Sequence, residues 1–259
     1  NTQQRRDDIL ARAMECGHVT VRGLAEACDV SEATVRRDLR ALAEAGRLKL
    51  AYGGAYLPRN ANFSFRSKAE RNAEAKRVIG RLAAELVDDG DQVFVDSGTT
   101  CFELARCLRP KDELSVIVNS VRVAEELDAP GLSVILVGGH YRPDRMDAVG
   151  PIATGALEKL RGYVAFVGTD GLDPDFGPSA SDIESAEVYG LAVRNSRAAV
   201  LLADHSKFQC PSLYKICEWD VIGRVVTDRP PDEQWADFLA SRGIEVIVPA
   251  GAAAESVSP

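Results

Sequence analysis

Apolar residues near the N-terminus recur at spacings of three and four, a pattern that predicts three short helices. The first helix runs roughly over residues 5–15, the second covers residues 21–28, and the third begins after Ser31. Only two residues separate the second helix from the third, which is the short turn that a helix-turn-helix requires. We therefore expect a helix-turn-helix at about residues 19–38.

The third predicted helix has two faces of different character. Its apolar stripe consists of Val35, Leu39 and Leu42 at positions i, i+4 and i+7, and the opposite face is polar and basic. In a helix-turn-helix, the second helix enters the DNA major groove with its N-terminal residues at the base edges. An ordinary amphipathic helix with a solvated basic face is the alternative interpretation. The residues that we expect to contact DNA are Ser31, Thr34, Arg36, Arg37, Arg40, Arg47 and Lys49.

Residues 47–52 alternate in character and run into Gly53 and Gly54, a pattern that predicts a small β-hairpin, or wing. Three helices and a wing form a winged helix-turn-helix, and residues 1–57 are enough for such a domain. Residues 58–72 contain Pro, Asn, Ser and many charges with little apolar periodicity, which predicts an interdomain linker.

Residues 73–250 are predicted to form a second, larger domain, and residues 251–259 a disordered tail. Short runs rich in Val, Ile and Leu alternate there with helical stretches. This rhythm is typical of strands buried on both faces, so we expect an α/β domain with a mostly parallel sheet and three layers. The predicted strands are 92–96, 115–119, 133–137, 164–168, 198–203, 224–227 and 245–248. The predicted helices between them are 100–108, 121–127, 152–160, 186–195 and 232–241.

Charge is distributed unevenly between the two predicted domains. The chain has a formal net charge of −8, but residues 1–60 hold 10 Lys and Arg against 8 Asp and Glu, a local balance of +2. The remaining residues therefore carry −10. An acidic bulk repels DNA, so we expect binding to be local to the small domain and sensitive to salt.

The cysteines and histidines show no spacing typical of a metal site. We expect no metal and no cofactor, and we interpret the six cysteines as small core residues. Asp7 and Asp8 stand where a signal peptide would turn apolar, and no apolar run approaches the roughly 18 residues of a membrane helix. These features predict a cytoplasmic protein with reduced thiols and no membrane partner.

Polar residues follow five consecutive predicted strands. The first strand leads through Asp96, Ser97, Gly98 and Thr99 into a helix, and a helix N-terminus with nearby hydroxyl groups attracts anions. No Gly-Lys-Ser/Thr follows, so this is not a Walker loop. A simple strand-to-helix turn with a capping hydroxyl is the alternative. The other strand ends are Asn119-Ser120, Gly138–Arg142, Gly168–Gly171 and Asp204–Lys207.

In open α/β sheets, ligands bind beyond the carboxyl ends of the strands. Five polar strand ends together therefore predict a site for a small, phosphorylated, polar ligand. The residues that we expect in this site are Asp96, Ser97, Gly98, Thr99, Thr100, Asn119, Gly138, Gly139, Arg142, Gly168, Asp170, Gly171 and Lys207.

The motifs at both ends of the chain resemble those of the DeoR family of bacterial transcriptional regulators. The N-terminal signature comprises Arg6, Leu10, Met14, Ser31 and the run from Thr34 to Leu39. Two wing positions depart from it, because Leu50 and Tyr52 stand where the family usually has Arg and His. The sensor-domain resemblance covers most of residues 63–228 and rests on Phe65-Arg66, Asn72, Lys76, Asp96–Thr100, Asn119, Gly138-Gly139, Gly150, Gly168–Gly171, Asp204, Ser206-Lys207 and Thr227-Asp228.

This resemblance implies a sensor domain related to ribose-5-phosphate isomerases and CoA transferases, which binds a phosphorylated sugar or polyol and controls release from an operator. It places phosphate at positions 97–100, the sugar at Asp170 and Lys207, and Asn119 and Arg142 nearby. A further departure is Tyr189, which occupies a position where the family commonly has Lys. Two residues, Glu184 and Glu187, are both candidates for the glutamate that precedes it.

The sequence therefore predicts a regulator, and not an enzyme, most simply a repressor of a carbohydrate or polyol catabolic operon. A single head reads few bases, so we expect a homodimer or homotetramer on repeated half-sites. Two alternatives are a sugar-phosphate isomerase-like enzyme with a DNA-binding appendage, and a nucleic-acid-binding protein with a degenerate sensor. For the isomerase, Asp173 and Asp175 are the candidates for an extra general base.

Overall fold

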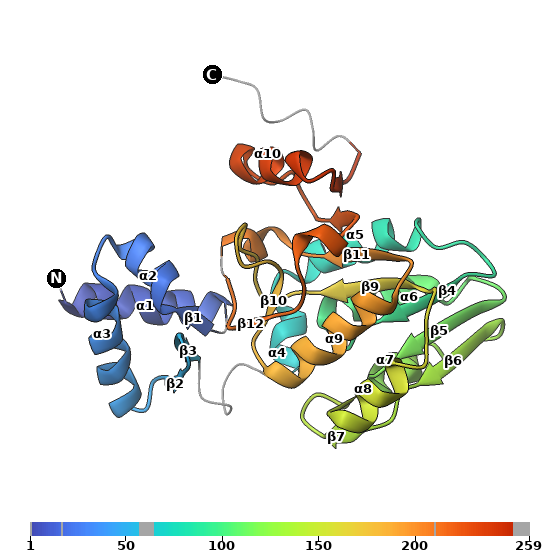
Figure 1. Ribbon diagram of the computed structural model, residues 1–259, viewed down its shortest axis with the longest axis horizontal. Coiled ribbons are helices and arrows are strands. Elements are labelled where there is room, and N and C mark those ends of the chain that lie inside the picture. Colours follow the sequence, from blue (N-terminus) through green and yellow to red (C-terminus); the bar gives the residue numbers. More distant parts are fainter. Residues whose placement is uncertain (1, 17, 57–64, 210, 251–259) are drawn as a thin grey trace.

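The computed structural model describes residues 2–16, 18–56, 65–209 and 211–250, which form a small N-terminal head and a larger α/β domain (Figure 1). The head lies at one end of the molecule, with strand β1 toward the larger domain. The head consists of α1 (Thr2–Cys16), β1 (His18–Thr20), α2 (Val21–Cys28), α3 (Glu32–Glu44), β2 (Lys49–Ala51) and β3 (Gly54–Tyr56).

The three predicted helices of the head are present, and their ends have local causes. Helix α2 begins after Thr20, whose hydroxyl accepts a hydrogen bond from the backbone of Gly23. It ends at Asp29, which adopts the left-handed conformation with φ at 50°. Helix α3 begins after Ser31, whose hydroxyl accepts a hydrogen bond of 3.2 Å from the backbone of Thr34.

Helix α3 packs its apolar stripe on the core of the head. Val35 and Leu39 are fully buried there. Asp38, on the same helix, accepts hydrogen bonds from Arg5 at 2.6 Å and from Arg6 at 2.9 Å. This buried carboxylate ties α1 to α3, so the two outer arginines of α1 stabilise the head.

The wing contains one strand that the sequence did not predict. Strands β2 and β3 pair antiparallel as expected, and β1 adds to β3 on its other side, with His18 opposite Tyr56. A strand of three residues is too short to show an alternating pattern. The wing is therefore a three-stranded sheet whose outer strand β1 lies next to the larger domain.

The larger domain is built on seven strands that are all parallel, which confirms the predicted fold class. All seven lie at the predicted positions, with each end shifted by at most one residue. The strands are β4 (Gln92–Val95), β5 (Leu114–Val118), β6 (Leu132–Leu136), β9 (Val164–Gly168), β11 (Ala198–Leu202), β13 (Arg224–Val226) and β14 (Glu245–Ile247).

The strand order places a switch point in the middle of the sheet. The order is β14-β13-β11-β9-β4-β5-β6. The chain thus proceeds from β4 outward through β5 to β6, and then returns to β9 on the other side of β4. At such a reversal the loops at the carboxyl ends of the two central strands diverge and leave a crevice.

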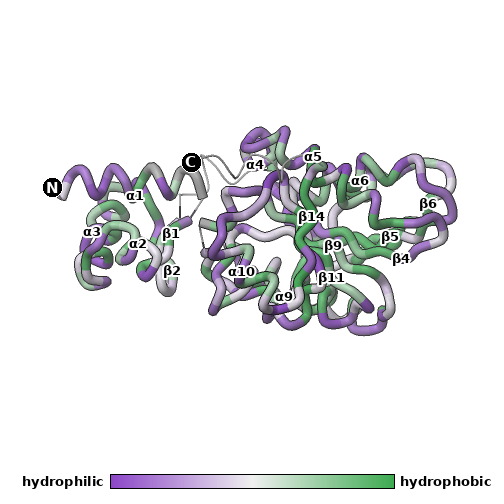
Figure 2. Tube along the Cα trace, turned by 90° about the horizontal axis from the view of Figure 1, so that it is seen from above, coloured by the Kyte–Doolittle hydropathy of each residue, from purple (hydrophilic) through white to green (hydrophobic). Residues whose placement is uncertain are grey.

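Helices cover both faces of the sheet and complete three layers. Val93 and Val95 of β4 face the core shared with α5, α6 and α7, whereas Phe94 faces the core shared with α8, α9 and α10. Figure 2 shows the strands as largely hydrophobic, consistent with burial on both faces. These helices are α5 (Ala73–Ala84), α6 (Thr99–Leu108), α7 (Val121–Glu126), α8 (Pro151–Leu157), α9 (Ile183–Asn195) and α10 (Glu233–Ser241).

Part of the predicted linker is a helix of the larger domain. Within residues 58–72, α4 (Phe65–Glu70) packs on α6, and the rings of Phe65 and Phe102 meet edge to face at 5.4 Å. The guanidinium group of Arg122 lies 4.1 Å from the centre of the Phe65 ring. A six-residue helix anchored by one large apolar side chain leaves too little periodicity to be recognised. Residues 57–64 lie outside the described residues.

Two short antiparallel pairs were also not predicted, because strands of two or three residues carry no pattern of their own. They are β7 (His140–Arg142) with β8 (Asp147–Val149), and β10 (Ser179–Ala180) with β12 (Tyr214–Lys215). Two 3-10 helices, η1 (His205–Gln209) and η2 (Trp219–Val221), complete the domain. No helix in the described ranges is both long and apolar enough to cross a membrane. The predicted tail, 251–259, lies outside the described residues.

Candidate functional site

A pocket of about 560 Å³ opens at the carboxyl ends of β4, β9 and β11, at the switch point of the sheet. Eight of the thirteen residues predicted for a ligand site line it. They come from three strand ends that are far apart in the sequence, so the sheet assembles them as the strand-end argument expected. These eight residues are Asp96, Ser97, Gly98, Thr99, Thr100, Gly168, Asp170 and Lys207.

The N-terminus of α6 forms one wall of the pocket and is not capped by a side chain. Gly98 occupies the cap position and makes no side-chain hydrogen bond. The next two residues, Thr99 and Thr100, are each only 8% exposed, and their hydroxyl groups have no hydrogen-bond partner within the described chain. Free N–H groups, the helix dipole and the two hydroxyls together favour an anion at this end of the helix.

Asp96 holds the backbone of this wall in place. Its buried carboxylate accepts hydrogen bonds from the backbone N–H groups of Gly98 at 2.6 Å and Gly168 at 2.5 Å. Burial raises the pKa of Asp96 above its ordinary value, while these bonds lower it in part. A Cβ atom at Gly98 would lie 2.9 Å from the carboxylate, so the loop needs glycine there. Asp96 thus joins the loops after β4 and β9.

Ser97 also lines the pocket, but its hydroxyl is occupied. It donates a hydrogen bond to Asp147 at 3.0 Å and shares another of 2.7 Å with the hydroxyl of Tyr189. Both partners are buried. Ser97 therefore offers fewer free donors to a ligand than Thr99 or Thr100.

Arg142 does not line the pocket, contrary to the sequence-based expectation. Its guanidinium group makes a two-point contact with Asp147, at 2.6 and 2.8 Å, and further bonds with Asp182 at 2.7 Å and Ser185 at 2.9 Å. These contacts clamp the β7–β8 hairpin to α9. Arg145, between β7 and β8, does line the pocket, and it also donates to Asp182.

Four other predicted residues also lie outside the pocket lining, namely Asn119, Gly138, Gly139 and Gly171. The first three follow β5 and β6, which lie on the side of β4 away from β9, and the β7–β8 hairpin packs over this part of the sheet. Asn119 is buried and donates to the backbone carbonyl of Ala148 in that hairpin. Gly171 instead forms a bridge with Ser179. These are structural positions, so being at a strand end was not sufficient to reach the pocket.

Three cationic residues that were not predicted for the site line it from α4, α5 and the turn between them. They are Lys68, Arg71 and Lys76, and they line the pocket together with Lys207. The ammonium group of Lys68 lies 2.6 Å from a carboxylate oxygen of Asp170. Lys68 and Arg71 fall within the predicted linker, which is why sequence analysis did not assign them. Lys76 was noted only as part of the family resemblance.

Lys76 is buried among like charges. Its ammonium group donates to the backbone carbonyls of Lys68, at 2.5 Å, and Arg71. Burial lowers the pKa of Lys76 to about 8; Asp204 opposes this shift, and the cations of Lys207, Lys68 and Arg71 add to it. An anion in the pocket would relieve this repulsion.

Asp170 is the acidic centre of the pocket. Burial raises its pKa, but Lys68 and Lys207 outweigh burial, and the pKa lies well below its ordinary value. The second carboxylate oxygen accepts hydrogen bonds from Ser181, at 2.9 Å from the backbone and 2.7 Å from the hydroxyl. Asp170 is therefore an ionised hydrogen-bond acceptor at the pocket wall.

Other acidic candidates lie elsewhere. Glu184 is 3.7 Å from Arg142, Glu187 is exposed, and neither lines the pocket. Asp173 accepts backbone hydrogen bonds within its own loop, and neither it nor Asp175 lines the pocket. Within the described residues, no group of three or more His, Cys, Asp or Glu side chains is arranged to hold a metal ion.

The outer face of the head presents the residues that were expected to contact DNA. Arg37 and Arg40 of α3 are exposed and have no ion-pair or hydrogen-bond partner in the described part of the chain. Arg36 is paired with Glu32 at 2.5 Å. Ser31 and Thr34 share a hydrogen bond of 2.9 Å at the start of the helix.

The wing extends the same basic surface. Arg47 and Lys49 are exposed, and Tyr52 at the tip of the wing is 99% exposed. Sequence analysis treated Tyr52 only as a departure from a family pattern. An aromatic ring that is almost fully exposed on the same hairpin as two cations is a further candidate for contact with the DNA backbone.

Two family models match the chain. A DeoR-like helix-turn-helix domain matches residues 5–61, and a DeoR C terminal sensor domain matches residues 71–229. The HTH-type transcriptional repressor GlcR of Bacillus subtilis (strain 168) is 32% identical and aligns with 93% of each chain. The glycerol-3-phosphate regulon repressor of Escherichia coli (strain K12) is 29% identical, over 94% of this chain and 97% of its own.

Solved structures resemble the larger domain only distantly. A translation initiation factor eIF-2B from Pyrococcus horikoshii OT3 covers 60% of this chain and 62% of its own, with 19% identity and a TM-score of 0.41. Ribose 5 phosphate isomerase A of Neisseria gonorrhoeae covers 51% and 52%, with 18% identity and a TM-score of 0.35. Likeness at this level says nothing about activity. Because both domain models match in order and relatives align along nearly the whole chain, the protein belongs to the DeoR family of transcriptional regulators.

Proposed function

We propose that this protein is a repressor of a carbohydrate or polyol operon whose affinity for operator DNA is controlled by a phosphorylated sugar or polyol. One observation carries the proposal: the chain combines recognition-helix arginines that have no partner among the described residues with a pocket that favours an anion. The relatives named above are repressors, and one is named for a glycerol-3-phosphate regulon.

The phosphate group would bind at the N-terminus of α6. Thr99 and Thr100 offer backbone N–H groups and hydroxyls there, and Lys76 and Lys207 add positive charge to the same pocket. The polar remainder of the ligand would lie toward Asp170, whose carboxylate can accept hydrogen bonds from sugar hydroxyls.

The recognition helix would read bases through its unpaired arginines. An arginine that bonds to both acceptors of a guanine contributes roughly 1–3 kcal/mol of discrimination. Arg37 and Arg40 are exposed and unpaired within the described residues, so they give up no internal contact when DNA binds. We expect two or more chains to bind one operator, because a single head reads too few bases for genomic specificity.

An isomerase is the less favoured candidate. A general base works best when its pKa lies near the operating pH. The cations of Lys68 and Lys207 hold the pKa of Asp170 well below its ordinary value, and neither Asp173 nor Asp175 lines the pocket. These features favour binding over proton transfer.

A thermal-shift panel tests the ligand half of the proposal. Glycerol 3-phosphate, ribose 5-phosphate, glucose 6-phosphate and fructose 1-phosphate would each be compared with the unphosphorylated parent. A compound at about 100 times its dissociation constant stabilises the folded chain by roughly 2.7 kcal/mol, which raises the melting temperature visibly. We expect at least one phosphorylated compound to do so while its parent does not.

An operator assay tests the other half. DNA duplexes selected from a random pool by the full-length protein would be titrated with and without the stabilising compound. We expect the compound to change operator affinity at least several-fold. Isomerase activity that disappears in Asp170→Asn would favour the enzyme instead, and stabilisation by parents and phosphates alike would exclude a phosphate-dependent sensor.

A further inference from the structure

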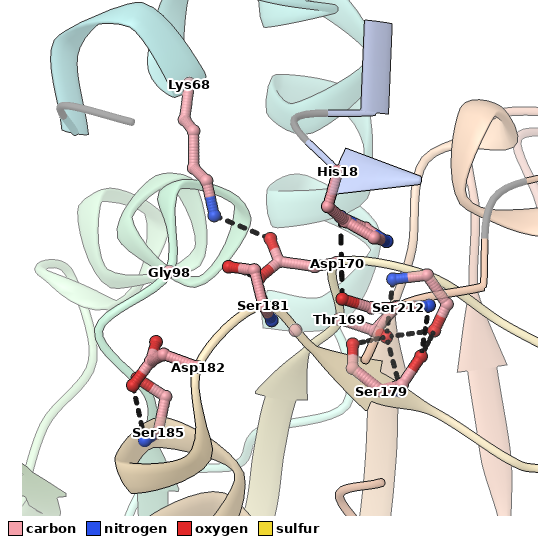
Figure 3. A network of polar contacts seen from close by, with 12 residues as sticks. His18, Lys68, Gly98, Thr169, Asp170, Ser179, Ser181, Asp182, Ser185 and Ser212 are labelled. Carbon is pink, nitrogen blue, oxygen red and sulfur yellow. Dashed lines mark hydrogen bonds and ion pairs between the residues drawn. The ribbon is translucent and has the colours of Figure 1, made fainter. Parts of the chain in front are cut away.

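Among the described residues, the DNA-binding head contacts the sensor domain mainly through β1, the outer strand of its wing, and α2 adds an exposed ion pair of 3.9 Å between Arg22 and Asp175. His18 of β1 is only 1% exposed, and its Nε2 donates a hydrogen bond of 2.8 Å to the backbone carbonyl of Pro211. Its Nδ1 lies 3.5 Å from the hydroxyl of Ser212. We call residues 211–213 the seat. Figure 3 shows His18 reaching from β1 toward this segment, with Asp170 close by.

Two glycines of the head lie against the seat. A Cβ atom at Gly54 of β3 would lie 3.1 Å from a methyl carbon of Leu213, and one at Gly23 of α2 would lie 3.7 Å from the Pro211 ring. The seat therefore touches β1, β3 and α2 together. A segment that contacts three elements of the head can fix its orientation, which a single side-chain contact could not.

The seat is connected to the pocket by a short chain of hydrogen bonds (Figure 3). The backbone N–H of Ser212 donates to the hydroxyl of Ser179 at 2.8 Å. The backbone carbonyl of Ser179 accepts from the backbone N–H of Asp170 at 2.9 Å. Two hydrogen bonds, both made by Ser179, thus connect Asp170 in the pocket with Ser212 in the seat.

Asp170 also holds the covalent connection to the head. Lys68, its ion-pair partner at 2.6 Å, lies on α4, the first described element after the wing. The non-covalent route through the seat and the covalent route through α4 therefore meet at one carboxylate. A phosphorylated compound in the pocket competes with Asp170 for the ammonium group of Lys68, and it acts on both routes at once.

The chemistry of His18 suits a contact that must be made and broken. Burial lowers its pKa, which Asp170 and the Pro211 carbonyl oppose and the cations of Lys207 and Lys68 reinforce. The ring is therefore neutral at pH 7, with its proton on Nε2 facing the carbonyl. A hydrogen bond from a neutral ring contributes little net stability, so the contact is reversible.

We propose that the seat is a second, intramolecular binding surface of the sensor domain, which takes the wing of the DNA-binding head and releases it when a phosphorylated compound draws Lys68 away from Asp170. This inference rests on the proposed function for the identity of the compound. The surface itself is defined by His18, Gly54 and Gly23 on the head and by the seat on the sensor domain.

The first experiment measures the seat without any added compound. Hydrogen–deuterium exchange would be followed on the full-length chain for the wild type, His18→Ala, His18→Gln and His140→Ala. His140→Ala is the matched control, because that histidine is exposed and lies on the β7–β8 hairpin. We expect the Ser212 amide to exchange at least tenfold faster in His18→Ala. His18→Gln keeps a side-chain donor and retains part of the protection, and His140→Ala matches the wild type.

Equal protection of the Ser212 amide from exchange in the wild type and both His18 variants would overturn the proposal that the seat binds the head. If the head of His18→Ala unfolds, as shown by exchange throughout α1 and α3, His18→Gln decides the question in its place. Ser179→Ala provides a test from the sensor side, because it removes the hydroxyl that accepts from Ser212 and leaves the head unchanged. We expect it to speed exchange at the same amide.

The second experiment measures release. Operator affinity would be determined with and without the panel compound that gives the largest thermal shift, and with inorganic phosphate as an anion-only probe. We expect the ratio of the two affinities to fall toward one in His18→Ala and Ser179→Ala, while both variants bind the compound as the wild type does. An undiminished ratio in both would refute release through the seat. A wild type that responds to nothing would contradict the proposed function, whereas the exchange experiment would still decide whether the seat exists.

Discussion

The head and the pocket both carry cationic side chains, but in opposite environments. Arg37 and Arg40 lie in solvent, unpaired within the described chain, at the surface of a domain with a slight positive balance. Lys68 and Lys76 are held in a pocket, where one is ion-paired with Asp170 and the other has a pKa lowered to about 8. We infer that Arg37 and Arg40 contribute to DNA binding independently and weakly. Lys68 and Lys76 act as a coupled unit, because the charge of one affects the other.

The largest expected effect comes from removing a charge of the coupled group. Lys76→Met should weaken binding of the active phosphorylated compound by about 100-fold, because a charged hydrogen bond contributes up to about 3 kcal/mol. Operator affinity without the compound should stay within twofold of the wild type. Calorimetric titration measures the first quantity and fluorescence anisotropy the second. Lys159→Met, at an exposed lysine just after α8 that does not line the pocket, is the matched control and should bind normally.

A smaller effect is expected from the exposed group. Arg37→Ala should weaken operator binding by about 2 kcal/mol, roughly 30-fold, and should reduce the slope of affinity against salt concentration if the lost contact is to phosphate. The melting temperature should not change, because Arg37 has no partner in the described chain. Arg36→Ala, which also breaks a pair with Glu32, is the comparison variant. A fall in melting temperature for Arg37→Ala would mean that Arg37 stabilises the fold, which would contradict its assignment as an exposed DNA-contacting residue.

The pH dependence of compound binding is a further difference between the pocket lysines and the exposed arginines of the head. A bound phosphate stabilises the protonated form of Lys76, so the pKa of Lys76 in the complex lies above its value of about 8 without phosphate. Affinity is therefore full below pH 8 and is lost as pH rises through it, by about tenfold between pH 7 and pH 9. The phosphate itself titrates near pH 6 and stays a dianion over this range. Lys76→Met should show no such loss, and an equal slope in both proteins would assign the titration to another group.

The smallest effect is expected at Ser97, although the sequence places it in the phosphate loop. Its hydroxyl is already bonded to Asp147 and Tyr189, so Ser97→Ala should weaken compound binding less than about threefold while lowering stability by about 1 kcal/mol. Thr100→Val, which removes an unpaired hydroxyl at the same wall, should weaken binding more. Calorimetric titration and chemical denaturation of both variants measure these effects. If Ser97 were the phosphate ligand, Ser97→Ala would weaken compound binding more than Thr100→Val.

The sequence predicted the head closely because its information is local. The apolar spacing of Val35 and Leu39, the cap at Ser31 and the short turn before it all lie within about 20 residues. The parallel strands were predicted for a similar reason, since each is a contiguous apolar run. Both predictions concern contacts between neighbours in the chain.

The pocket was predicted only in part, because it depends on which strands become neighbours. Asn119 and Gly138 follow strands just as Asp170 does, but β5 and β6 lie on the far side of β4. Lys68 lies on a short helix whose position is fixed by one aromatic contact with α6. A pattern along the chain does not report strand order or the docking of a six-residue helix.

Because the switch point lies between β4 and β9, the residues of the two pocket walls can change independently in evolution. One wall follows β4 and carries the helix end at Thr99 and Thr100, whereas the other follows β9 and β11 and carries Asp170 and Lys207. These walls come from halves of the sheet that diverge along the chain. A regulator built this way can keep its anchor for phosphate and acquire a new preference for the rest of the molecule through changes confined to residues 168–217.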